Sequence, residues 1–167
     1  MHKNQLQRQR RQQHGGGIMY WGMVLPNGLI YLRKMDGYVN SQKYMFLLEN
    51  YAVPIMKLNM EPGFHFVQDN CPCHVSKITK QFLSAQDFDL LDWPANSPDL
   101  NLMENIWRML SNLVYSEGQP QNKDELNIRI VKAVHTINSE KRTVVLNLYH
   151  TYRQRLVNVL NCKGKLV

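Results

Sequence analysis

Two carboxylates, Asp69 and Glu104, stand where acidic side chains could support metal chemistry. Asp69 follows a short, largely apolar segment and precedes the turn-forming sequence Asn70-Cys71-Pro72, so it is predicted at the end of a strand. After 34 intervening residues comes Glu104, inside a helix predicted to begin at Ser97 and to run to about residue 115. Carboxylates that converge from such elements are ligands for hard divalent cations.

The predicted helix places Glu104 on its apolar face. Apolar residues recur at spacings of three and four, namely Leu100, Met103, Trp107, Leu110 and Val114. A buried, unpaired carboxylate is costly, so such a group is normally paired, protonated or bound to a cation. A second carboxylate and a metal ion would meet that need. The alternative is that Glu104 reaches solvent from the edge of the face and that Asp69 only shapes a turn.

Several longer motifs surround these carboxylates. They are Gly15-Gly16-Gly17-Ile18-Met19-Tyr20-Trp21-Gly22, Gln68-Asp69-Asn70 with Pro72 and His74, Asp92-Trp93-Pro94, Ser97-Pro98-Asp99-Leu100-Asn101 and Glu104-Asn105-Ile106-Trp107. In order and spacing they resemble the catalytic domain of Tc1/mariner-family transposases, from about residue 15 to the C-terminus. The resemblance implies an α/β fold, an RNase H-like mixed sheet flanked by helices.

The same resemblance implies a DDE triad in which Asp69 is the second and Glu104 the third carboxylate. Such a triad holds two Mg²⁺ or Mn²⁺ ions for DNA cleavage and strand transfer. The implied partners are DNA, as transposon ends and target, and a further copy of the chain in a homo-oligomer. The implied location is the nucleus. Asn70, His74 and Asn105 are candidates for supporting the metal ligands or facing DNA.

One member of the triad is missing from this sequence. In the family the first Asp lies on a strand upstream of the glycine-rich segment, whereas residues 1–14 contain no Asp or Glu. Asp36 is no substitute, because it falls in a turn downstream of that place. Cys71 and Leu102 also depart from the family, which usually has Ala and Pro there. We therefore expect a catalytically incomplete domain; a non-catalytic DNA-binding or interaction protein derived from a transposase is the alternative.

Length and composition indicate one domain with a substantial core, since 167 residues contain 44% apolar residues. We expect residues 1–14 to form a disordered basic, Gln-rich tail and residues 15–167 to form the partial DDE domain. No apolar run is long enough for a membrane span, and no secretory signal is visible, so we expect no membrane partner and an intracellular chain. The three cysteines do not suggest a disulfide framework. Cys71-Pro72-Cys73-His74 lacks the second ligand pair of a structural zinc site, which favours an ordinary turn.

Charge is unevenly distributed along the chain. Residues 61–117, which include both carboxylates, carry a net charge of −5, whereas residues 1–17 carry +4 and residues 118–167 carry +6. Basic flanks around an acidic centre suit a protein that binds a phosphate backbone near a metal site.

The pattern of elements predicts a β-hairpin at residues 18–25 and 29–35, then a helix capped by Asn40 or Ser41 and ending before Pro54. A strand at 64–69, a helix at 74–85, a strand at 88–92 and three helices follow. The strand that would bear the first Asp is the central one of such a sheet, and residues 1–14 are too polar to replace it. Either the hairpin pairs directly with the Asp69 strand, or the two halves pack poorly and leave unpaired strand edges.

Overall fold

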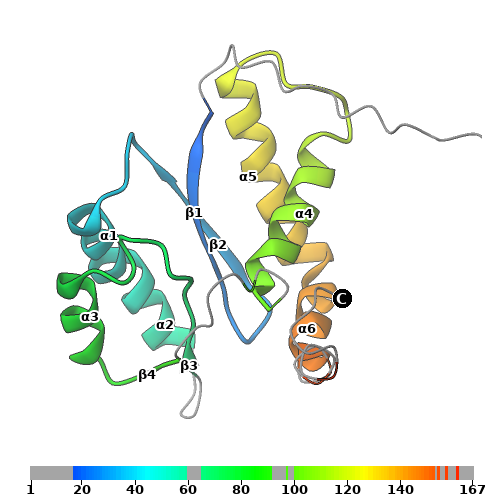
Figure 1. The fold of residues 1–167 in the computed structure, drawn as a ribbon. Helices are drawn as coiled ribbons and strands as arrows, with labels where there is room; N and C mark the ends of the chain where they lie inside the picture. Colours follow the sequence, from blue (N-terminus) through cyan, green and yellow to red (C-terminus); the bar gives the residue numbers. More distant parts are fainter. Residues whose placement is uncertain are drawn as a thin grey trace, which may run out of the picture.

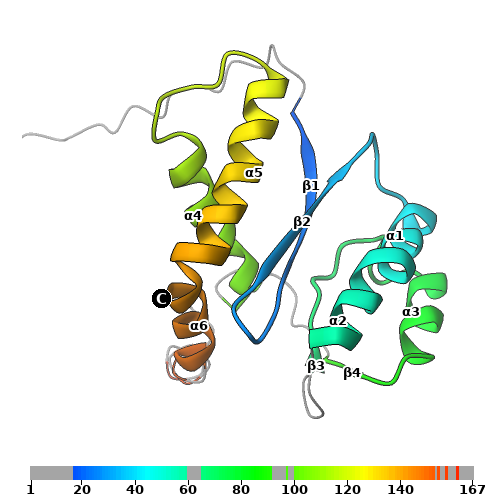
Figure 2. The same cartoon turned by 180° about the vertical axis from the view of Figure 1, so that it is seen from behind.

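The computed structural model describes residues 17–59, 65–91, 97, 100–152, 154, 157 and 161. Predictions that fall on residues 1–16, on Asp92-Trp93-Pro94 and on Pro98 and Asp99 lie outside this part of the chain. A β-hairpin runs through the middle of the molecule, with one group of helices on each side of it (Figure 1). Seen from behind, the same two groups flank the hairpin (Figure 2).

The hairpin consists of β1 (Met19–Val24) and β2 (Ile30–Met35), which pair antiparallel from Met19↔Met35 to Val24↔Ile30. Its turn contains Gly28 at φ +82°, a conformation that suits glycine because a Cβ would be strained there. The predicted hairpin is confirmed.

The first helical segment is longer than predicted. Asn40 caps α1 (Ser41–Leu47), and a π-helical turn (η1, Leu48–Ala52) leads directly into α2 (Val53–Asn59). The prediction that the helix ends before Pro54 is therefore wrong. The N–H of Val53 bonds to the carbonyl of Leu48, five residues back, and Pro54 then stands in the first turn of α2, where a missing N–H is tolerated.

The strand before Asp69 is shorter than predicted. β3 (His65–Phe66) pairs in parallel with β4 (Asp89–Leu90), and α3 (Lys77–Ser84) lies between them in sequence. Asp69 thus lies three residues beyond the strand. The helix predicted to start at residue 74 in fact begins three residues later, at Lys77, because Ser76 is the residue that caps α3.

Three helices complete the described chain: α4 (Leu102–Val114), α5 (Lys123–Glu140) and α6 (Arg142–His150). Ser97 does not cap α4 as predicted. Instead the side chain of Asn101 accepts from the N–H of Met103, and the carbonyl of Ser97 accepts from Leu100 in a separate turn. None of the helices in the described residues is long and apolar enough to span a membrane.

Both faces of the hairpin are buried, and its residues alternate between two cores. One face contributes Trp21, Met23, Leu25, Leu29, Tyr31 and Met35 to the core formed with α1, η1, α2, α3 and β3. The other contributes Val24, Ile30 and Leu32 to the core formed with α4, α5 and α6. The hairpin therefore joins the two halves of the molecule.

Within the described residues, the strands form two separate two-stranded sheets, β1–β2 and β3–β4. The hairpin does not pair with β3, so the first of the two alternatives, direct pairing with the Asp69 strand, is wrong. On the outer edge of β2, Asn138 of α5 bonds to both backbone groups of Ile30: its amide accepts from the N–H and donates to the carbonyl, both at 2.9 Å. On the edge of β1 that faces away from β2, none of the strands in the described part of the chain pairs.

Gly22 allows α4 to approach β1 closely. A Cβ at this position would lie 2.5 Å from Met103 Cε and 2.9 Å from both Trp107 Cζ2 and Leu32 Cδ2. Since Met103 and Trp107 belong to the helix that carries Glu104, the missing side chain of Gly22 fixes how near Glu104 comes to the hairpin.

We predict that Gly22→Ala lowers the free energy of unfolding by about 1–3 kcal/mol, because three packed side chains must move to admit one methyl group. Urea denaturation followed by circular dichroism measures the loss. Gly17→Ala is the matched control, since nothing lies within 4 Å of a Cβ there. Equal unfolding midpoints for the two variants would contradict the close packing of α4 on β1.

Candidate active site

A cavity of about 560 Å³ opens between β1, the segment that follows β3, and the start of α4. Its wall is largely apolar and includes Met19, Trp21, Met23, Phe66, Val67, Leu100, Leu102, Met103 and Trp107. Asp69 and Glu104 both lie on this wall. The two predicted carboxylates therefore line one space, next to the edge of β1 that no described strand pairs with.

Asp69 shapes the turn that leaves β3. Its Oδ1 accepts from the backbone N–H of Cys71 at 3.1 Å and lies 2.7 Å from Nδ1 of His74. The carboxylate remains 55% exposed, so solvent and ions reach it. Asp69 is both the turn residue that the alternative interpretation proposed and an accessible carboxylate on the cavity.

His74 is held from three sides. Nδ1 faces Oδ1 and, at 3.3 Å, the carbonyl of Asp69, and because both are acceptors, Nδ1 carries the proton. The Tyr44 ring lies against the imidazole with centroids 4.2 Å apart. Gln68 accepts from the Tyr44 hydroxyl at 2.7 Å and donates to the His74 carbonyl at 3.2 Å. Sequence reasoning missed the contact of Tyr44 with His74, because Tyr44 shares no local motif with Asp69. Gln68 belongs to the motif around Asp69, but its role in linking Tyr44 to the His74 carbonyl was not predicted.

Glu104 lies in the first turn of α4 and is exposed. The prediction that it points into the core is wrong. The buried face of α4 is formed by Ile106, Leu110 and Val114, which recur every four residues, and Glu104 lies on the opposite side, two residues before Ile106. Exposure removes the burial cost that had suggested a paired or metal-bound group, so a metal role for Glu104 now depends on its place beside the cavity.

The other candidate residues named from the sequence do not all line the cavity. His74 lines the cavity, whereas Asn70, Asn105 and Asp36 do not. Asn70 is exposed and Asn105 is half-buried. Among the described residues, His74 is therefore the supporting candidate that the fold brings to the carboxylates.

The described wall of the cavity offers Asp69 and Glu104 as its acidic groups. Two carboxylates can coordinate one hard cation, but a two-metal site needs more oxygen ligands. The residues present thus fit the hard-cation chemistry of a DDE site only in part.

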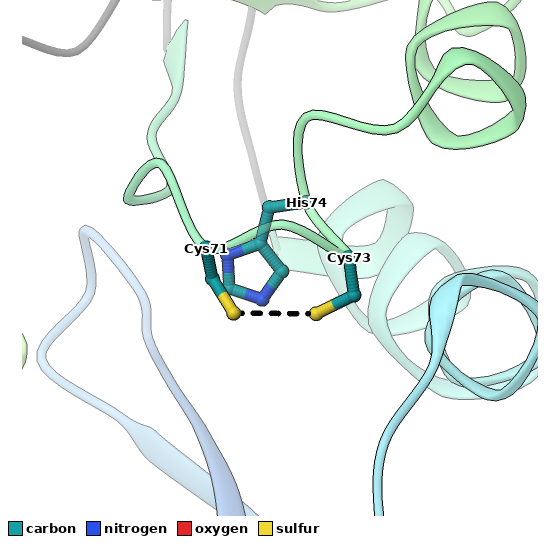
Figure 3. A group of neighbouring side chains, drawn as sticks. All are labelled: Cys71, Cys73 and His74. Atoms are coloured by element: carbon teal, nitrogen blue, oxygen red, sulfur yellow. Dashed lines mark hydrogen bonds between the residues drawn. The ribbon is translucent and has the colours of Figure 1, made fainter.

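The turn after Asp69 also brings two thiols together. Cys71 and Cys73 place their sulfur atoms 3.5 Å apart, and the imidazole of His74 lies beside them (Figure 3). Cys71 is exposed and Cys73 is buried. Burial, and secondarily contact with Cys71, raises the pKa of the Cys73 thiol to about 11.

The sequence matches a known protein family. The sequence matches the family described as DDE superfamily endonuclease over residues 1–127, and the chain belongs to this family. Transposable element Tc3 transposase of Caenorhabditis elegans is 30% identical over 157 residues, which make up 93% of this chain and 46% of that protein. The chain thus spans about half the length of this relative. The predicted resemblance to Tc1/mariner transposases is confirmed.

Solved structures support the fold. The Mos1 transposase catalytic domain, solved with Raltegravir and Mn, superposes with a TM-score of 0.70 at 14% identity, covering 90% of this chain and 82% of that one. The Mos1 mariner paired end complex with Mn gives a TM-score of 0.74 at 16% identity, covering 95% of this chain and 47% of that one. The predicted RNase H-like α/β class is confirmed.

We predict that iodoacetamide modifies Cys71 at least about tenfold faster than Cys73 at pH 8, because alkylation needs an accessible thiolate. Cys73 is buried and stays protonated below its pKa of about 11, so its rate rises as the pH approaches that value. Fragmentation mass spectrometry separates the two sites. In urea, the matched control, the rates converge; equal rates in the folded chain would contradict the structure of this turn.

Proposed function

We propose that this chain is the DDE part of a Tc1/mariner-type DNA transposase, with Asp69 and Glu104 as the metal-binding carboxylates of DNA cleavage and strand transfer. The single observation that supports it is that both side chains, separated by 34 intervening residues, line one cavity beside the edge of β1 that no strand of the described residues pairs with.

Asp69 and Glu104 would hold Mg²⁺ or Mn²⁺. The related Mos1 domain has been solved with either metal. When bound, such ions activate the attacking oxygen and neutralise charge that develops on the phosphate. His74 would keep the Asp69 carboxylate in one orientation, since its Nδ1–H donates to Oδ1.

The chain as it stands is proposed to be catalytically incomplete. A third carboxylate would be supplied by a strand inserted between β1 and β3. These two strands belong to separate sheets and flank the cavity. An apolar, extended segment suits that place, because it would pair with exposed strand edges and cover an apolar wall. We propose residues 15–167 as this partial domain and residues 1–14 as a basic tail.

DNA is the proposed partner. Exposed cations line α5 and α6, namely Lys123, Lys132, Lys141 and Arg142, and would contact phosphates. Mos1 supports this assignment, because its solved structure is a paired end complex. We propose the nucleus as the location, in keeping with a DNA substrate. The edges of β1 and β3 that no described strand pairs with favour pairing with a second copy of the chain. These exposed cations also support the second candidate, a non-catalytic DNA-binding derivative.

The test adds the missing element. We predict that an N-terminal extension carrying the Asp-bearing strand of the Tc3 relative tightens Mn²⁺ binding at least about tenfold and enables Mn²⁺-dependent nicking of supercoiled DNA. The matched controls are the same extension with its Asp changed to Asn, and the extended chain with Asp69→Asn. Both should keep the extended fold by circular dichroism and lose nicking.

An extended chain that gains thermal stability but binds Mn²⁺ no better would contradict the metal assignment. Persistent, salt-sensitive DNA binding without metal binding would favour the non-catalytic derivative.

A further inference from the structure

The turn between β3 and α3 carries a second group of metal-ligating side chains. Cys71, Cys73 and His74 place one ligand atom each within 4.8 Å of one another. These are two sulfurs and one imidazole nitrogen, whereas the carboxylates proposed for catalysis offer oxygen. Soft thiolates and imidazole favour zinc over Mg²⁺ or Mn²⁺. The two groups therefore differ in the metal that they select.

We propose that Cys71, Cys73 and His74 form a Zn²⁺ site on the wall of the cavity, with Asp69 as the hydrogen-bond acceptor that orients His74. This site is separate in chemistry from the carboxylate site, although Asp69 adjoins both.

The sulfur positions suit tetrahedral zinc. Zn–S bonds of about 2.3 Å separate two thiolates in a tetrahedron by about 3.8 Å. The sulfurs of Cys71 and Cys73 are 3.5 Å apart, so a few tenths of an ångström of movement satisfies that spacing. The imidazole must move more, since the group as a whole spans up to 4.8 Å.

The imidazole presents the correct nitrogen. Nδ1 of His74 donates to Asp69, which leaves Nε2 with a lone pair for a metal. Zinc-bound histidines normally hold their other nitrogen in this way against a carboxylate. In Figure 3 the ring lies beside the pair of sulfurs, on the same turn of the chain.

The turn that carries these ligands is held by its own hydrogen bonds. The carbonyl of Cys71 accepts from the N–H groups of His74 and Val75, at 2.8 and 3.1 Å. The carbonyl of Cys73 accepts from the buried hydroxyl of Thr79 at 2.7 Å. Binding therefore orders little additional backbone, which favours affinity.

The fourth coordination position faces the cavity. Cys71, Cys73 and His74 all line that space, and the thiol of Cys71 is exposed. Three protein ligands with an open position resemble a reactive zinc centre more than a closed structural one. This explains why the sequence alone favoured a turn over zinc: no second ligand pair follows, and none is needed for an open site.

The test is a Co²⁺ titration of the reduced full chain. Thiolate ligation gives an intense near-ultraviolet charge-transfer band, tetrahedral geometry gives strong visible bands, and Zn²⁺ should abolish both by displacement. We expect about one ion per chain. Cys71→Ser, which changes an exposed residue and should preserve the fold, is expected to weaken binding at least about tenfold and reduce the charge-transfer intensity.

Three variants separate this site from its surroundings. Cys162→Ser, the matched control, should leave the Co²⁺ spectrum unchanged. Asp69→Asn should weaken Co²⁺ binding by about 10–100-fold while keeping the thiolate band, as expected for a residue that orients a ligand. Glu104→Gln should leave the Co²⁺ charge-transfer band and the Co²⁺ affinity of this site unchanged, although it removes a proposed ligand of Mn²⁺.

The proposal would be overturned by a reduced, folded chain that shows no charge-transfer band. A band that survives Cys71→Ser unchanged, or one lost in Cys162→Ser, would equally overturn it. None of these three results bears on Mn²⁺ binding, so the proposed function is tested separately by its own experiment.

Discussion

The edge of β1 that no strand of the described residues pairs with is the constraint on which the rest of this structure depends. Both faces of the hairpin pack against a core, and on the outer edge of β2 the amide of Asn138 bonds to both backbone groups of Ile30. On the free side of β1, the carbonyl of Val24 accepts from the Tyr149 hydroxyl at 3.1 Å, but no strand of the described residues pairs there. The two sheets stay apart, and Asp69 and Glu104 both line the cavity beside that edge.

A different structural feature positions each side of that cavity. On the β1 side, Gly22 brings α4 close enough for Met103 and Trp107 to pack on the strand, which places Glu104 at the rim. On the β3 side, a hydrogen-bonded turn holds Asp69, His74 and the two thiols. One turn thus presents hard oxygen and soft sulfur ligands side by side, and their different metal preferences allow both to be probed in one chain.

The hairpin and the protein family were predictable from the sequence, because both depend on short local patterns of residues. The hairpin follows from alternation and its glycine turn, and the family follows from the motifs around Asp69 and Glu104. The continuation of the helix through Pro54 was not predictable, because it depends on a π-helical turn that precedes the proline and leads directly into α2. The predicted orientation of Glu104 was also wrong. Leu100 and Met103 suggested that Glu104 lies on the buried face of the helix, but the residue that enters the core is Ile106. The contact between Tyr44 and His74 joins distant segments, which no local pattern encodes.

The most direct test of the central claim is a calorimetric Mn²⁺ titration of this chain beside the Asp69→Asn, Glu104→Gln double variant, with folding checked by circular dichroism. If the two carboxylates converge on one cation, the chain binds Mn²⁺ weakly and the folded double variant loses that heat. Equal binding by both chains, or no binding by the folded wild type, would contradict the assignment of Asp69 and Glu104 as a shared metal site.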